Sequence, residues 1–267
     1  MNRRTKATLE DVARLAGVST ATVSRALSRP DLLQGETLAR VQGAIAQLNY
    51  VPGGAARALA SGRTLTIGAV IPTLDHAIFA RAIQAMQTEL AASGYQLLIA
   101  ASDYVPGLEL AAVRAMLARG VDALMVVGAD HLEDTWSLLV NASVPVVLSW
   151  SFDARLPSIG FDNHRAGRLV ADYLLGLGHR RFGMISGHTR ANDRIRVPEQ
   201  VSIAGIDNLE IAAHLSPPLT TVHLPTTDLG RAVADHLLAR LKGQEPPARM
   251  ELPIDLVVRR STGPAGP

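Results

Sequence analysis

From residue 65 onward, short apolar runs alternate with amphipathic helices, and this alternation constrains the fold more than any other feature. The runs LTIGAVI, YQLLIA, ALMVV, VPVVLS, RFGMIS and VSIAGI begin at residues 65, 95, 123, 144, 181 and 201 and are rich in β-branched residues. Helical periodicity separates most of them, at about 77–92, 106–119, 133–142 and 164–177. Strands that alternate with helices form βαβ units, so the pattern predicts an α/β body built on parallel sheets.

Residues that follow the predicted strands are the first candidates for a ligand site, because open parallel sheets bind ligands beyond the carboxyl ends of their strands. Each candidate also has a structural interpretation: an aspartate at such a position caps a helix or forms a turn, and a phenylalanine belongs to the core. The candidates are Leu74, Asp75, Phe79, Ser149, Trp150, Asp162, Asn163, residues 188–194, Asp207 and Asn208.

Residues 8–27, TLEDVARLAGVSTATVSRAL, predict two short helices joined by a tight turn. Thr8 and Ser19 are expected to cap the helices, and Gly17 allows the reversal between them. A third helix, at about 37–49, closes a three-helix head. The second helix turns Val23 and Leu27 inward and exposes Thr20, Ala21, Thr22, Ser24 and Arg25. Small hydroxyl side chains and an arginine can reach phosphates and base edges in a DNA major groove, which is typical of a helix-turn-helix.

The charge distribution supports a nucleic-acid partner for the head alone. Residues 1–65 hold nine Lys or Arg side chains and four Asp or Glu side chains, a net charge of +5. Since the whole chain carries +2, the remaining residues carry −3. A basic head on a mildly acidic body predicts a polyanionic partner that contacts only the head.

Signatures of catalysis are absent from the sequence. It holds no cysteine, no glycine-rich nucleotide loop, no nucleophile elbow and no zinc-protease motif. His131, Glu133 and Asp134 cluster in HLEDTW, where they are interpreted as residues that cap a helix. We therefore expect no enzyme, no cofactor and no metal. With no secretory leader and no apolar run long enough to span a bilayer, the expected location is the cytoplasm.

Taken together, these motifs resemble the lac repressor (LacI/GalR) family of bacterial transcription regulators. The resemblance covers nearly the whole chain and includes the head, LNYVP and ARALASGRTLTIG, then IPTLDHAIFARAI, GVDALMVV, SIGFDNHRAGRLVADYLLGLGHRRFGMISG, RVPEQVSIAGIDN, PPLTTV and DLVVRRS. It implies a helix-turn-helix head at 1–51 and a hinge helix at 52–63. Residues 64–267 would form a two-lobed effector and dimerisation domain similar to periplasmic binding proteins.

The resemblance also implies a homodimer that reads double-stranded, pseudo-palindromic operator DNA and holds a small effector, a sugar or sugar acid, between its lobes. Thr20 and Ala21 match the positions that select bases, Arg25 matches a base-contacting arginine, and Leu59 matches a leucine wedged into the minor groove. The DNA contacts implied are Thr8, Ser19, Thr20, Ala21, Thr22, Ser24, Arg25, Arg57 and Leu59. The effector contacts implied are Phe79, Trp150, Arg194 and Asp207.

The sequence departs from the family at one junction. Two motifs that lie far apart in the family meet here, with only Ile195 between Arg194 and Arg196. Roughly two βαβ-sized pieces of about 30 residues each are missing, which predicts a second lobe truncated near 194–197. A natural deletion, a damaged or engineered reading frame and an excised segment all remain open as explanations.

We therefore interpret the chain as a sequence-specific DNA-binding regulator, a repressor whose response to an effector is impaired. Two other classes remain alternatives. One is a small-molecule sensor whose head no longer binds DNA, and the other is an α/β enzyme whose chemistry lacks a recognisable motif.

Overall fold

The computed structural model describes residues 7–51, 62–183 and 196–266, and the chain divides into two compact units at residues 65 and 66. Residues 52–61, most of the hinge predicted at 52–63 and including Gly53, Gly54, Arg57 and Leu59, lie outside the described residues, as does Arg194. The two units are the head and the body.

The head has the three helices that the sequence predicts, α1 (Leu9–Ala16), α2 (Thr20–Ser28) and α3 (Gly35–Leu48), with a short 3-10 turn, η1 (Pro30–Leu32), before the third helix. Val12, Val23 and Val41, one from each helix, are completely buried and form the centre of its core. Ala26 is buried while Leu27 is only half-buried. The buried face of α2 is therefore centred on Val23 and Ala26 and not, as the sequence predicts, on Val23 and Leu27.

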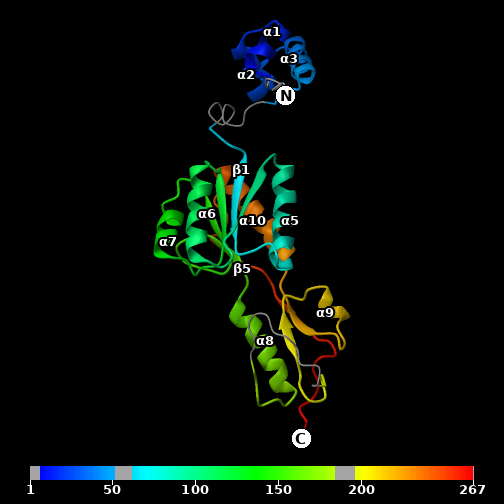
Figure 1. Cartoon of the computed structure of the whole chain (residues 1–267). Coiled ribbons are helices and arrows are strands. Elements are labelled where there is room, and N and C mark those ends of the chain that lie inside the picture. Colours follow the sequence, from blue (N-terminus) through cyan, green and yellow to red (C-terminus); the bar gives the residue numbers. More distant parts are fainter. Residues whose placement is uncertain (1–6, 52–61, 184–195, 267) are drawn as a thin grey trace, which may run out of the picture. The chain divides into compact units, whose positions relative to one another are not determined.

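The first lobe of the body is built on a six-stranded parallel sheet with the strand order β2-β1-β3-β4-β5-β8. Its strands are β1 (Thr66–Ile71), β2 (Gln96–Ala101), β3 (Ala123–Val127), β4 (Val146–Trp150), β5 (Ser158–Gly160) and β8 (Arg249–Glu251). Its helices are α5 (Ala77–Ala92), α6 (Pro106–Ala118), α7 (Glu133–Val140) and α10 (Thr226–Leu241). Figure 1 shows α6 and α7 on one side of this sheet and α5 and α10 on the other. The predicted βαβ organisation is confirmed here.

Helices α5 and α10 cross closely because a glycine lies at their contact. A Cβ placed on Gly230 would lie 2.1 Å from the carbonyl oxygen of Ala82. The backbones can approach this far only where one residue has no side chain. Helix α10 also buries Leu229, Val233 and Leu237 against the first lobe.

In the described residues of the second lobe, a sheet with the order β6-β7-β9 packs with two helices. Its elements are α8 (Asn163–Gly176), β6 (Ala204–Ile206), α9 (Ile211–His214), β7 (Thr220–His223) and β9 (Asp255–Val257). Strand β9 is antiparallel to β7, which strand periodicity did not predict. The described chain passes between the lobes three times: after β5, after β7 and after β8.

Residues 181–183, the first half of the predicted strand RFGMIS, are not in a strand, and residues 184–186 lie outside the described residues. A strand requires a neighbour for its N–H and C=O groups, and residues 181–183 have no such neighbour among the strands that the structure describes. Phe182 is consequently 53% exposed. Other large apolar side chains exposed in this lobe are Leu175, Val201, Ile203, Ile206, Ile211, Leu215 and Val258.

Candidate functional site

The N-terminal part of α2 presents a polar face to solvent. Thr20, Ala21 and Arg25 are exposed, while Thr22 and Ser24 are half-buried. Ala21 and Arg25 are four residues apart and therefore lie on the same face of the helix. Among the described residues no acidic side chain forms an ion pair with Arg25, so its guanidinium is available for another partner.

Two side-chain caps fix the helices that carry this face. The Thr8 hydroxyl accepts a hydrogen bond from the Asp11 backbone N–H at 3.2 Å and donates to the Asp11 carboxylate at 2.7 Å. The Asp11 carboxylate also accepts from the Thr8 backbone N–H at 3.0 Å, and the two hydrogen bonds that it accepts from Thr8 lower the pKa of Asp11 below its ordinary value. The Ser19 hydroxyl accepts a hydrogen bond from the Thr22 backbone N–H at 3.2 Å. Between the two helices, Gly17 has the left-handed φ of 66° that the reversal of the chain requires. The predicted caps and turn are confirmed.

Four aromatic side chains meet where the two lobes of the body adjoin. The Phe79 ring lies 5.0 Å from the Trp150 ring and 6.2 Å from the His76 ring, between their centroids. The Tyr104 hydroxyl is 3.3 Å from Nδ1 of His76. His76 and Phe79 come from the start of α5, while Tyr104 and Trp150 come from the carboxyl ends of β2 and β4. We call these four residues, with Asp207, the junction cluster.

Trp150 has an unsatisfied polar group in this cluster. Its indole Nε1 is buried and has no hydrogen-bond partner among the described residues, whereas its backbone oxygen accepts from the Asn163 amide at 3.4 Å. A buried N–H without a partner costs free energy, and such groups are rare in folded proteins. The indole N–H is therefore a donor that a bound ligand can satisfy.

Asp207 follows β6 and adds a carboxyl group from the second lobe. Burial raises the pKa of Asp207 above its ordinary value, and the nearby His76 partly opposes this effect. Burial and the charge of Asp207 together raise the pKa of Tyr104. The carboxyl, the phenol and the imidazole thus interact across the boundary between the lobes. A second cross-lobe contact is the ion pair between Arg81 and Glu210, at 3.3 Å.

Asn208 holds the loop that carries Asp207. Its side-chain oxygen accepts from the Arg259 guanidinium at 2.7 Å, and its side-chain nitrogen lies 3.3 Å from Nδ1 of His223. The same guanidinium donates to the Leu219 carbonyl at 2.6 Å. A charge-assisted hydrogen bond of this kind fixes the loop strongly.

Backbone strain concentrates at the same strand ends. Asp103 and Tyr104 after β2, Trp150 at the end of β4, and Asp207 and Asn208 after β6 all have positive φ, between 45° and 84°. Residues other than glycine seldom adopt positive φ, and backbone strain of this kind often marks functional sites. The strain at β4 and after β6 coincides with strand ends that the sequence singles out as candidates, whereas the strain after β2 lies at an end that it does not.

The structure brings Phe79, Trp150 and Asp207, three of the four predicted effector contacts, to one junction, and the fourth, Arg194, lies outside the described residues. Sequence reasoning missed His76 and Tyr104. Their position shortly after β1 and β2 is the same signal that identified Phe79 and Trp150. Asp162 instead takes its structural role: it caps α8 by accepting from the Arg165 N–H at 2.8 Å.

HLEDTW does begin a helix, since α7 starts at Glu133, but the interpretation of its polar residues as caps is wrong. Leu132 is the N-cap of α7 and no side chain caps that helix. His131 instead forms a 2.7 Å hydrogen bond through Nδ1 with Glu109, and its ring contacts Trp136 edge-on. The side chain of His131 is 1% exposed, so it belongs to the packing between α6 and α7.

Across residues 7–51, 62–183 and 196–266, no three His, Cys, Asp or Glu side chains are grouped as a metal site would require. The helices described there all fall short of the length and apolar character needed to cross a membrane.

The head and the body each match models of known protein families. Residues 8–53 match the model of bacterial regulatory proteins of the lacI family. Residues 64–189 match the periplasmic binding proteins and sugar binding domain of the LacI family, and residues 189–262 match a periplasmic binding protein-like domain. These matches adjoin at residue 189, close to the Arg194–Arg196 junction.

Individual relatives span almost the whole chain. The HTH-type transcriptional repressor PurR of Vibrio vulnificus is 27% identical over 326 aligned positions, which cover 95% of this chain and 98% of that protein. Since this chain has only 267 residues, the relative carries residues that are absent here, in agreement with the predicted internal deletion. The relatives are transcriptional repressors by name.

Solved structures show the same fold. A LacI-family transcriptional regulator from Silicibacter pomeroyi superposes with a TM-score of 0.85 at 24% identity, covering 96% of this chain and 99% of that one. The lac repressor dimer bound to operator and the anti-inducer ONPF gives a TM-score of 0.84 at 23% identity, covering 97% and 99%. With the head, the body and the relatives all in agreement, the chain belongs to the lacI family of bacterial regulatory proteins.

Proposed function

We propose that this protein is a sequence-specific DNA-binding repressor of transcription that acts as a homodimer in the cytoplasm. The observation that carries the proposal is the exposed face of α2, where Thr20, Ala21 and Arg25 project from a head with a net charge of +5. Hydroxyl and guanidinium groups on such a helix can reach base edges, and the charge attracts the phosphate backbone.

In this proposal the DNA-contacting residues of the head divide into those that contact bases and those that contact phosphates. Thr20 and Ala21 select bases, Arg25 contacts a base edge, and Thr22 and Ser24 contact phosphates. Thr8 and Ser19 lie at helix N-termini, where a backbone phosphate can approach. Arg57 and Leu59, outside the described residues, would contact the backbone and the minor groove.

The experiment that tests DNA binding is a selection from a randomised duplex library, followed by fluorescence anisotropy at several salt concentrations. We expect one pseudo-palindromic sequence to be enriched and bound at least about a thousandfold more tightly than scrambled DNA. The affinity should fall as salt rises, because cationic side chains displace counterions from the phosphates. Equal affinity for enriched and scrambled duplexes would contradict the proposal.

We propose further that the junction cluster is what remains of an effector site for a sugar or sugar acid. Phe79 and Trp150 offer aromatic surface, the indole N–H offers an unused donor, and Asp207 offers a carboxyl group. Arg194 would add a cation. The predicted response is impaired, because an effector shifts a conformational equilibrium only through different contacts in the two states, and the second lobe lacks part of its contacting surface.

The junction cluster also favours a second candidate function, a small-molecule sensor that does not bind DNA. Calorimetry with a panel of sugars and sugar acids, together with the anisotropy measurement, separates the two. A ligand bound with micromolar affinity by a protein that binds no DNA supports the sensor. A ligand that releases bound DNA contradicts the impaired response.

A further inference from the structure

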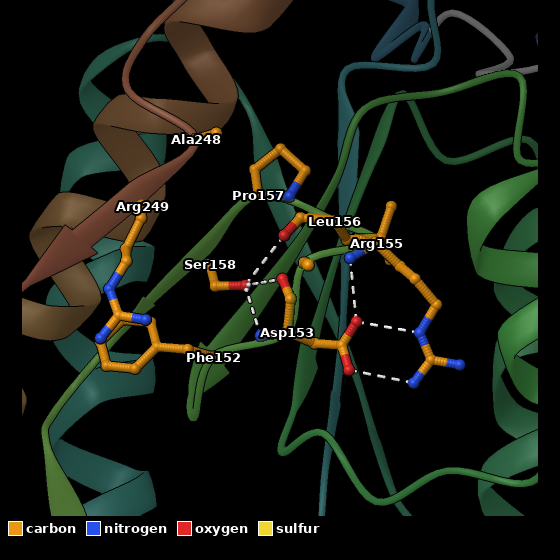
Figure 2. Close-up of a pocket in the computed structure, with 9 residues that line it drawn as sticks. Phe152, Asp153, Arg155, Leu156, Pro157, Ser158, Ala248 and Arg249 are labelled. Atoms are coloured by element: carbon orange, nitrogen blue, oxygen red, sulfur yellow. Dashed lines mark hydrogen bonds and ion pairs between the residues drawn. The ribbon is translucent and has the colours of Figure 1, made fainter.

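A pocket of about 390 Å³ lies in the first lobe and shares no lining residue with the junction cluster. Its walls are the loop from Phe152 to Pro157, the first residue of β5 and the first residue of β8 with its neighbour Ala248. Figure 2 shows Arg249 and Phe152 on one side, Asp153 and Arg155 on the other, and Ser158 between them. Pockets that bind small molecules have volumes of roughly this size.

The loop that forms most of the wall is held in one conformation. The buried Ser158 hydroxyl donates to the Leu156 carbonyl at 2.9 Å and lies 3.3 Å from both the backbone oxygen and the backbone nitrogen of Asp153. The Asp153 carboxylate accepts two hydrogen bonds from the Arg155 guanidinium, at 2.9 and 3.0 Å. These bonds close the loop on itself, so the pocket exists before any ligand arrives.

Arg155 is committed to this structural role. In addition to its two bonds with Asp153, its guanidinium lies 3.5 Å above the Trp136 ring. The hydrogen bonds from Arg155 lower the pKa of Asp153 to about 2. Asp153 is therefore charged at every physiological pH and already neutralised, so the charge that the pocket offers a ligand comes from elsewhere.

Arg249 supplies that charge. Its guanidinium lies 3.7 Å above the Phe152 ring, which fixes its plane, and it donates only through Nη2, to Glu251 at 3.2 Å. Both partners are partly exposed, with side-chain exposures of 61% for Arg249 and 39% for Glu251, so this ion pair is weak. The Nε and Nη1 donors of Arg249 have no partner among the described residues. A planar guanidinium with unused donors suits a carboxylate.

The other walls are mainly apolar. Ala154, Leu156, Pro157 and Ala248 line the pocket, and the hydroxyl of Ser158 is already used. A sugar would find few groups to bind its hydroxyls here, and an inorganic anion would leave most of the volume unfilled. From this arrangement we propose that the pocket binds a small aromatic carboxylate, with the carboxylate on Arg249 and the ring against Leu156 and Pro157.

This site is independent of the proposed function. It lies in the first lobe, whose sheet and helices are all described, and it uses no residue of the head or of the junction cluster. The protein can therefore bind a ligand in this pocket even if it does not bind DNA, and it can bind DNA even if the pocket binds no ligand.

The test is a titration of the full chain with benzoate, followed by calorimetry and by the amide ¹H–¹⁵N signals of residues 152–158 and 248–249. We expect saturable binding with a dissociation constant of about 1 mM or below, and signal shifts concentrated at those residues, except Pro157, which has no amide proton. Arg249→Gln should weaken binding at least tenfold. Arg119→Gln is the matched control, because Arg119 is an exposed arginine of the same lobe outside the pocket, and it should change nothing.

Two further variations keep the outcome decisive. Ala248→Trp, at an exposed position, should fill the pocket and abolish binding while Arg249 is kept. Benzamide, which has the ring but no negative charge, should bind at least tenfold more weakly than benzoate. The proposal is overturned if Arg249→Gln and Arg119→Gln bind benzoate equally, if the shifts fall elsewhere, or if inorganic phosphate binds as tightly as benzoate.

Discussion

The rings of Phe79 and Trp150 meet with their centroids 5.0 Å apart and their planes inclined by 55°. Phe79 is 5% exposed, so the residue predicted to contact an effector is also part of the first lobe's core. The two interpretations of Phe79 that the sequence allows are therefore compatible. Phe79 is packed in the lobe, while the neighbouring Trp150 carries the unused indole donor.

Phe79→Ala should lower the free energy of unfolding by about 3 kcal/mol, because it leaves a cavity and removes an aromatic contact. Urea denaturation measures this loss. Phe182→Ala is the matched control: Phe182 is mostly exposed, and its truncation should change the stability by no more than about 0.5 kcal/mol. Similar losses for the two variants would mean that Phe79 is not packed as described.

Asp207→Asn should stabilise the protein at neutral pH. Burial raises the pKa of Asp207, so ionising it costs more in the folded state than in the unfolded state. The cost is absent below the ordinary value of 3.8, grows as the pH rises through that value, and is complete above the folded-state pKa. Thermal melts should therefore show Asp207→Asn above the parent at pH 7 and equal to it at pH 3. A variant that is less stable at pH 7 would contradict this assignment.

His236→Leu should stabilise the protein more at pH 5 than at pH 8. His236 is 3% exposed, and neither ring nitrogen has a partner among the described residues. Burial, and then the charge of Arg240, lower the pKa of His236. The unfolded state therefore binds a proton more readily, and stability is lost as the pH falls through the ordinary value of 6.5. Denaturation at both pH values checks this: an unchanged pH dependence in the variant would exclude His236 as its source.

Gly230→Ala should destabilise the first lobe, because its methyl group would meet the Ala82 carbonyl oxygen and force α5 and α10 apart. Overpacking of this kind costs about 1–3 kcal/mol. Gly107→Ala in α6 is the control, since nothing lies within 4 Å of its Cβ position, and helix propensity favours alanine there. The two substitutions should shift the midpoint of urea denaturation in opposite directions. Shifts of equal sign and size would show that the α5–α10 crossing is not as close as described.

Local signals in the sequence were sufficient for the head and for much of the body. The Thr8 and Ser19 caps and the left-handed Gly17 are short-range features, and the helix bounds of α5 agree with the predicted 77–92. Strand β5, with only three residues, was missed, because so short a run has no clear period. The antiparallel β9 was missed for the same reason.

Contacts between distant segments account for the rest. His131 pairs with Glu109 across 22 residues, and no periodicity encodes such a partner. His76 and Tyr104 join the junction cluster because the order of β1 and β2 in the sheet brings their loops together. The sequence predicts the ends of β1, β4 and β6 as ligand-site candidates, whereas the sheet order, which the sequence does not show, brings the end of β2 with Tyr104 to them.

The central claim, that α2 reads DNA sequence, is tested most directly by anisotropy on the selected duplex and on a scrambled duplex. Arg25→Ala should lose about 1–3 kcal/mol of binding free energy on the selected duplex and clearly less on the scrambled one, because Arg25 is assigned to a base edge. Arg57→Ala, assigned to a phosphate, should weaken both equally. If the parent protein binds the two duplexes equally, or if Arg25→Ala loses the same affinity on both, the assignment of α2 as the recognition helix is contradicted.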